Sequence, residues 1–188
     1  MLSDLDAFLA RHEPGGVQTV EWGTAASPIP LRIAGYLSQE LPPLEYVASV
    51  RGVVFCRDRV LVMRNRDGVH VLPGGQREGD ETLVETLQRE VLEEAGWTVE
   101  VGGMLGFLHL RHLGLKPPDS SPGISYLYPD FAQVVFLAEA VDHKPEARLP
   151  DDYEFEAAFR TAPEARNVGA VLAGRPFLEE ALRLRGGG

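Results

Sequence analysis

The chain has 188 residues, of which 44% are hydrophobic and 24% are charged, and this composition is typical of one soluble globular domain. It excludes a disordered chain, a collagen-like fibre and a disulfide-rich miniprotein, since the sole cysteine is Cys56. With 28 acidic and 18 basic residues, the formal net charge of −10 disfavours a nucleic acid polymer or an anionic membrane as a partner.

The first 45 residues are expected to form an N-terminal extension (1–45) that packs on a core domain (46–188). Residues 1–12 have an amphipathic pattern that predicts a short helix, and residues 17–22 alternate like a strand. Residues 25–43 hold four prolines and are expected to be irregular. The start of the chain lacks the features of a secretory signal and no apolar run predicts a membrane span, so a cytoplasmic location is expected.

The core domain is expected to contain both strands and helices. A hairpin is expected over 47–56 and 59–63, turning at Arg57-Asp58, and further strands over 69–72, 98–101, 105–110 and 133–140. Helices are expected over 161–171 and 176–184, and the proline-rich stretch 116–129 is expected to be a binding or mobile loop. The clearest helix is predicted over 80–95, with Asp80 as N-cap and Gly96 as its C-terminal stop.

Three carboxylates lie close together on this predicted helix. Glu90, Glu93 and Glu94 are three and four positions apart, so they project on one flank beside the apolar face. Their mutual repulsion near the carboxyl end of a helix is unfavourable unless a cation offsets it. Oxygen ligands suit Mg²⁺ or Mn²⁺, although a solvated acidic face is the alternative explanation of the cluster taken alone.

The spacing of these residues resembles the complete signature of the Nudix hydrolase family. The match consists of Gly75, Glu81, Arg89-Glu90-Val91, Glu93-Glu94, Gly96 and Trp97, and Leu72-Pro73-Gly74-Gly75 extends it upstream. Trp97 is larger than the aliphatic residue usual at that position. The resemblance implies an α/β/α sandwich with a mixed β-sheet and a catalytic loop and helix. It also implies Mg²⁺-dependent hydrolysis of a nucleoside diphosphate linked to another group, such as a nucleoside triphosphate, a nucleotide sugar or ADP-ribose.

The resemblance also assigns roles to individual residues. Glu90 and Glu94 would be the principal metal ligands, Glu93 a further ligand or the activator of water, and the carbonyl of Gly75 would complete the metal shell. Arg89 would pair with Glu81 and hold the carboxylates in register. A catalytically silent Nudix-fold module that binds nucleotides stays open as an alternative, and an isomerase of isopentenyl diphosphate type would need a catalytic cysteine.

Other candidate residues lie near this signature. Arg64, Arg66, Arg77 and Gly74 are expected to contact substrate phosphates, and an acidic cluster (Asp151, Asp152, Glu154 and Glu156) offers an additional base, foremost Asp152 or Glu154. His70 could line the pocket, whereas His109 and His112 fall on opposite faces of a predicted strand and do not predict zinc. Trp22, Tyr126, Tyr128 and Phe131 could stack on a base, with core packing as the alternative. The oligomeric state is open, with a homodimer as one option.

Overall fold

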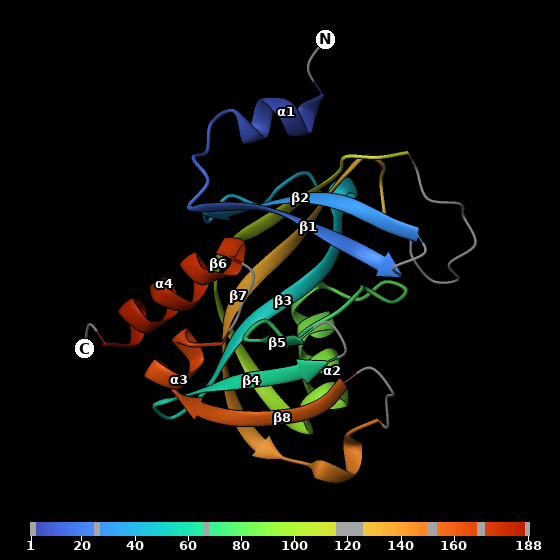
Figure 1. The fold of residues 1–188 in the computed structure, drawn as a ribbon. Coiled ribbons are helices and arrows are strands. Elements are labelled where there is room, and N and C mark those ends of the chain that lie inside the picture. Colours follow the sequence, from blue (N-terminus) through green and yellow to red (C-terminus); the bar gives the residue numbers. More distant parts are fainter. Residues whose placement is uncertain are drawn as a thin grey trace.

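A computed structural model describes residues 3–24, 27–65, 68–115, 126–149, 154–168 and 172–186. Its strands form one curled sheet in the order β1-β2-β6-β7-β3-β4-β5, with β8 pairing with β4 (Figure 1). The strands are β1 (Gly16–Thr24), β2 (Ser27–Leu37), β3 (Val47–Cys56), β4 (Arg59–Asn65), β5 (Gly68–His70), β6 (Trp97–His112), β7 (Asp130–His143) and β8 (Glu154–Thr161). The helices are α1 (Asp4–Leu9), α2 (Leu83–Ala95), α3 (Ala162–Arg166) and α4 (Arg175–Gly186), with 3₁₀ turns η1 (Leu44–Tyr46), η2 (Pro145–Ala147) and η3 (Leu172–Gly174).

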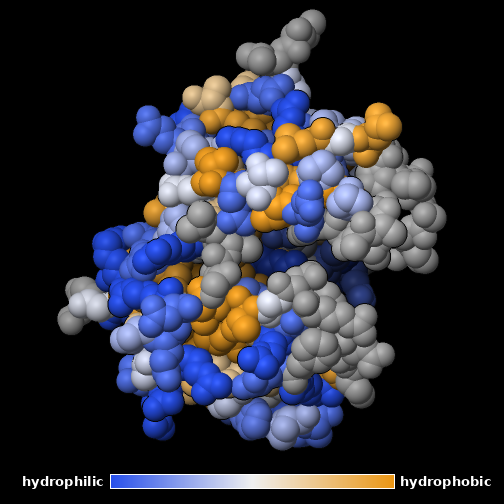
Figure 2. Space-filling model, in the orientation of Figure 1, coloured by the Kyte–Doolittle hydropathy of each residue, from blue (hydrophilic) through white to orange (hydrophobic). Residues whose placement is uncertain are grey.

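Helices cover both faces of this sheet. Along β3, Val50 and Val54 pack with α2, whereas Val53 and Phe55 point to the opposite face, where α4 packs. The sheet is mixed, because β3 runs parallel to β7 while the other pairs are antiparallel. The expected α/β/α sandwich with a mixed sheet is therefore confirmed. On the face seen in Figure 2, hydrophilic residues cover α4.

The N-terminal residues contribute to this same sheet. Helix α1 buries Leu5 and Phe8 against the sheet, and β2 pairs with β6 from Leu31 to Leu37. The expectation of an irregular stretch over 25–43 was wrong for residues 27–37, which form β2. Pro28 and Pro30 are tolerated because they lie in the first part of β2, which pairs with β1 and not with β6. Pairing with β6 begins at Leu31.

Strand β6 is longer than the sequence suggested. The strands expected over 98–101 and 105–110 are parts of one strand that runs from Trp97 to His112. Its ladder with β7 is irregular between Val101 and Gly106, and this irregularity lets one strand serve two parts of the curled sheet. β7 likewise extends beyond the expected 133–140 to Asp130–His143.

Helix α2 begins later than expected. Its N-cap is Thr82, not Asp80, because Thr82 and Glu85 form a reciprocal capping box. Gly96 ends the helix in the left-handed conformation, with φ 71°, as expected. Gly52 of β3 leaves room for α2, since a Cβ there would lie 3.0 Å from Leu87.

The C-terminal part differs from its expected outline in two places. Glu154 and Glu156 belong to β8, which pairs with β4, and not to an acidic loop or the start of a helix. α3 is shorter than the helix expected over 161–171, whereas the helix expected over 176–184 is confirmed as α4. In the ranges described here, no helix is both long and apolar enough to span a membrane.

Candidate active site

The glycine turn before α2 lies directly against β3. The amide N–H of Val50 donates to the carbonyl of Gly75 (2.9 Å), and that of Gly52 donates to Pro73 (2.9 Å). Gly74 has φ 128°, and a Cβ there would lie 2.2 Å from the carbonyl oxygen of Val50. Only glycine therefore fits at position 74, and the turn is fixed by backbone contacts.

Arg89 connects the turn with the carboxylates of α2. Its Nε lies 2.7 Å from Glu81 Oε1, and Nη2 donates to Glu81 Oε2 (3.1 Å) and to the carbonyl of Gln76 (2.8 Å). Its Nη1 donates to Glu90 Oε1 (3.0 Å) and Glu93 Oε2 (3.1 Å). The Arg89–Glu81 pair expected from the resemblance is present. A planar guanidinium can donate to all of these acceptors at once, whereas the single ammonium group of a lysine cannot.

Two carboxylates of α2 reach the glycine turn itself. Glu94 Oε2 accepts a hydrogen bond from the amide N–H of Gly74 (3.0 Å). A Cβ on Gly75 would lie 2.3 Å from Glu90 Oε1, so the absence of a side chain there makes room for this carboxylate. Burial raises the pKa of Glu90, although Arg89 and Arg51 oppose this shift. A half-buried carboxylate at such a turn favours a cationic partner.

The donor set fits a hard divalent cation. The carboxylates of Glu90 and Glu94 both lie at the turn that carries the Gly75 carbonyl, and Mg²⁺ and Mn²⁺ prefer oxygen ligands of these kinds. The Gly75 carbonyl itself accepts the hydrogen bond from Val50. Glu93 is held toward Arg89 with 35% of its side chain exposed. Among the described residues, no three Asp, Glu, His or Cys side chains are already gathered into a metal-binding group. Arg89 instead forms ion pairs with two of the three carboxylates of α2, Glu90 and Glu93.

The predicted phosphate-binding arginines are not all brought to this turn. Arg77 follows it, and its Nε donates to the carbonyl of Glu81 (3.0 Å). Arg64 alternates on β4 with Met63, which packs with α2, and it lines a separate cavity of about 300 Å³ that includes Glu156 and Arg160. Arg66, Asp151 and Asp152 lie outside the described residues, as does the side chain of Glu154.

The histidines and aromatic residues singled out in the sequence form other contacts. His109 Nε2 lies 2.7 Å from Asp130 Oδ1, whereas His112 contacts Tyr126 on the other face of β6, so the two do not share a site. Burial lowers the pKa of both histidines. Tyr126 stacks on Phe131 with ring centroids 4.3 Å apart, and the ring centroid of Tyr128 lies 5.4 Å from that of His112. These contacts support packing roles for the three aromatic residues. His70 of β5 lies 3.1 Å from Asn65, and the Trp22 side chain is outside the description.

Arg51 is a site residue that the sequence did not reveal. It lies on β3, its Nη1 donates to the carbonyl of Gly74, and its charge opposes the rise in the pKa of Glu90 that burial causes. It lies outside the signature, and only the pairing of β3 with the glycine turn brings it there. The one sequence signal was a charged residue in the middle of an apolar strand.

The chain is similar to known proteins in sequence and in fold. A family model described as NUDIX domain matches residues 46–181. A MutT-like protein of Streptomyces ambofaciens is 49% identical over 67 residues, covering 35% of this chain and 43% of the relative, so the match spans less than half of that protein.

Similar folds occur among solved structures. The Bacillus subtilis pyrophosphohydrolase BsRppH gives a TM-score of 0.54 at 17% identity, over 89% of this chain and 98% of its own. A NUDIX hydrolase from Nitrosomonas europaea gives a TM-score of 0.52 at 21% identity, over 74% of this chain and 88% of its own. A UDP-X diphosphatase gives a TM-score of 0.53 at 16% identity, over 80% of this chain and 66% of its own. Since the family model matches most of the chain, this protein belongs to the Nudix hydrolase family.

Proposed function

We propose that the protein is a divalent-cation-dependent hydrolase that cleaves a phosphoanhydride bond in a small nucleoside diphosphate derivative. The supporting observation is that two carboxylates reach one glycine turn: Glu94 accepts a hydrogen bond from the Gly74 amide, and Glu90, held by Arg89, lies against Gly75. Such an arrangement is costly for stability alone, because it concentrates like charge at a half-buried place.

The residues have distinct proposed roles. Glu90, Glu94 and Gly75 would hold Mg²⁺ or Mn²⁺, with Glu93 as a further ligand, and the cation would offset the charge of the diphosphate. Arg89 positions Glu90 and Glu93. Glu93, the more exposed of these two, would accept the proton of the attacking water, with Glu90 as the other candidate base. The oxygen of water bonds to phosphorus while the anhydride P–O bond breaks.

The substrate is proposed to be a small nucleotide. The turn and the acidic helix face would act on the diphosphate and the cation, whereas other parts of the site would read the group attached to them. Arg51 and Arg77 supply positive charge beside the turn in a chain of net charge −10. Nucleoside triphosphates and nucleotide sugars, including ADP-ribose, are the two classes to test, and the protein is proposed to act in the cytoplasm.

The direct test is product detection by chromatography. The wild type and Glu94→Gln would be incubated with Mg²⁺ and a panel of nucleoside triphosphates, nucleotide sugars, ADP-ribose and dinucleoside polyphosphates. We expect one class to be cleaved, with turnover lower in Glu94→Gln by about a hundredfold or more. EDTA should abolish the reaction, and Mg²⁺ or Mn²⁺ should restore it.

The controls separate lost chemistry from lost folding. Thermal unfolding should show that Glu94→Gln folds, and Glu100→Gln, an exposed carboxylate on β6, should keep full turnover. Hydrolysis that persists in EDTA would contradict the cation dependence. A folded protein that binds Mg²⁺ and nucleotides but cleaves no member of the panel would favour the catalytically silent binding module.

A further inference from the structure

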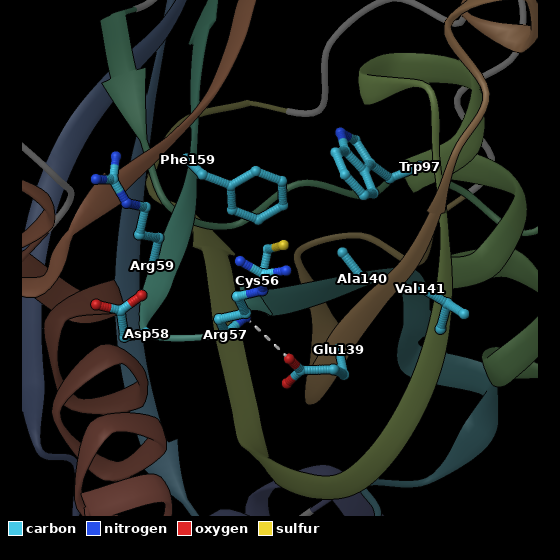
Figure 3. A pocket seen from close by; sticks show the side chains of 9 residues that line it. All are labelled: Cys56, Arg57, Asp58, Arg59, Trp97, Glu139, Ala140, Val141 and Phe159. Carbon is cyan, nitrogen blue, oxygen red and sulfur yellow. Dashed lines mark hydrogen bonds between the residues drawn. The ribbon is translucent and has the colours of Figure 1, made fainter.

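A second pocket lies at the far end of the sheet from the glycine turn. It has a volume of about 620 Å³ and is formed where the β3–β4 hairpin meets the start of β6, the end of β7 and β8 (Figure 3). Its lining residues are Cys56, Arg57, Asp58, Arg59, Trp97, Glu139, Ala140, Val141 and Phe159. None of these residues belongs to the proposed active site, and the size is that of a small-molecule site.

One wall of the pocket is aromatic. Trp97 and Phe159 meet edge to face, with centroids 5.3 Å apart and planes at 90°. His143 also stacks on Trp97, with ring centroids 4.6 Å apart. Trp97 replaces the aliphatic residue that the resemblance leads one to expect there. The larger ring adds a rigid planar surface of the kind on which ligand rings pack.

The base of the pocket presents an arginine from a fixed backbone. Arg57 has φ 57°, a left-handed conformation that favours glycine or asparagine and costs an arginine about 1 kcal/mol or more. Its amide N–H donates to Glu139 Oε1 (3.2 Å), and its carbonyl accepts from Arg185. In Figure 3 its side chain lies between Phe159, Trp97 and Glu139. The turn thus holds an arginine where local structure prefers another residue.

The charges around Arg57 leave its guanidinium available. Glu139 is already paired with Arg185, which also lies over the ring of Phe55 at 4.5 Å. Asp58 and Arg59 extend to the other side of the hairpin, away from Trp97 (Figure 3). In the described part of the chain, no carboxylate forms an ion pair with the Arg57 guanidinium. The pocket therefore combines an aromatic wall with the guanidinium of Arg57.

We propose that this pocket binds a phosphate monoester that carries a planar ring, of the nucleoside monophosphate class. The ring packs against Trp97 and Phe159, and the phosphate accepts hydrogen bonds from the Arg57 guanidinium. The pocket shares no residue with the proposed active site, so binding there does not depend on the proposed hydrolysis.

The test is a binding titration in metal-free buffer, where a catalytic cation cannot assist binding. The chain has two tryptophans, so Trp22→Phe leaves Trp97 as the only one, and its fluorescence reports on the pocket. We expect adenosine 5′-monophosphate to change this fluorescence saturably. Adenosine alone and inorganic phosphate alone should each bind about tenfold more weakly, since each keeps only half of the contacts.

Two matched variants locate the binding. Arg57→Asn removes the guanidinium while asparagine tolerates the left-handed turn, and it should weaken binding about tenfold or more. Arg11→Asn removes the same charge from an exposed arginine outside the pocket lining and should leave the affinity within about twofold. Both should unfold at wild-type temperature or close to it. Absence of saturable binding, equal binding of phosphate alone, or equal affinity in the two variants would each overturn the proposal.

Discussion

The carboxylate of Glu90 occupies the space that a side chain at Gly75 would need, since a Cβ there would lie 2.3 Å from Oε1. Gly75→Ala should therefore displace Glu90 from the turn while the helix stays folded. Its backbone is not in the left-handed region, so alanine adds no strain there beyond this contact. We expect turnover to fall about a hundredfold or more and Mg²⁺ affinity to weaken, as measured by steady-state kinetics and calorimetry.

Two other glycines provide the comparison for that variant. Gly103→Ala meets nothing within 4 Å and should keep full activity. Gly74→Ala should instead lose stability, because its Cβ would meet the backbone of Val50 at a residue with φ 128°. Equal turnover in wild type and Gly75→Ala would show that the reaction does not depend on the position of the Glu90 carboxylate beside Gly75.

Replacing Arg89 by lysine tests the role of the guanidinium rather than its charge. Lysine cannot reach Glu81, Glu90 and the Gln76 carbonyl together, so Arg89→Lys should lower the free energy of unfolding by about 2 kcal/mol. Turnover should fall as well. Arg166→Lys, in an exposed pair with Glu179, should cost less than about 1 kcal/mol in urea titrations. Similar losses in the two variants would contradict a special role for Arg89.

Acid stability depends on Glu81. Hydrogen bonds from Arg89 lower the pKa of Glu81 to about 2, against an unfolded value near 4.5. Its ionised form thus stabilises the folded protein above pH 4.5, and this contribution is lost as the pH falls through 2. Glu81→Gln should be less stable than wild type at neutral pH, and the difference should shrink between pH 4.5 and 2. Chemical unfolding at several pH values measures this.

The matched control for Glu81 is Glu40→Gln, which removes an exposed partner of Arg11. Its effect on the unfolding free energy should be small at neutral pH. A difference between wild type and Glu81→Gln that stays constant over the acid range would refute the assigned linkage.

Helix α1 is expected to stabilise the fold without taking part in the chemistry. Phe8 is buried, with its ring 5.3 Å from that of Phe107, so Phe8→Ala should cost about 3 kcal/mol. Phe8→Leu keeps most of the packing and should cost less. Turnover of both, measured well below their unfolding temperatures, should match the wild type. A folded but inactive Phe8→Ala protein would place α1 in the active site.

The sequence was most informative where a pattern has one local cause. The β3–β4 hairpin, the apolar face of α2 and the stop at Gly96 were all predicted, because alternation, helical periodicity and a glycine cap act within a few residues. The prediction of Asp80 as N-cap was wrong, because the reciprocal capping box of Thr82 and Glu85 begins the helix two residues later.

Elsewhere the outcome depends on partners distant in sequence. β2 is a strand despite two prolines, because the prolines fall where β6 does not pair. Arg64 was expected at the phosphates because it is near the signature in the chain, but the pleat of β4 turns it away from Met63 and α2. Arg51 was missed because the pairing of β3 with the glycine turn, not sequence proximity, places it there.

The pairing of β2 with β6 has a consequence for synthesis of the chain on the ribosome. Each residue from Leu31 to Leu37 pairs with a residue of β6 that is translated roughly 70–80 residues later. Until residue 112 has emerged, the β1–β2 hairpin has neither its inner neighbour nor the sheet face on which Leu5 and Phe8 pack. During synthesis the early hairpin therefore exposes apolar residues and is expected to need protection by chaperones.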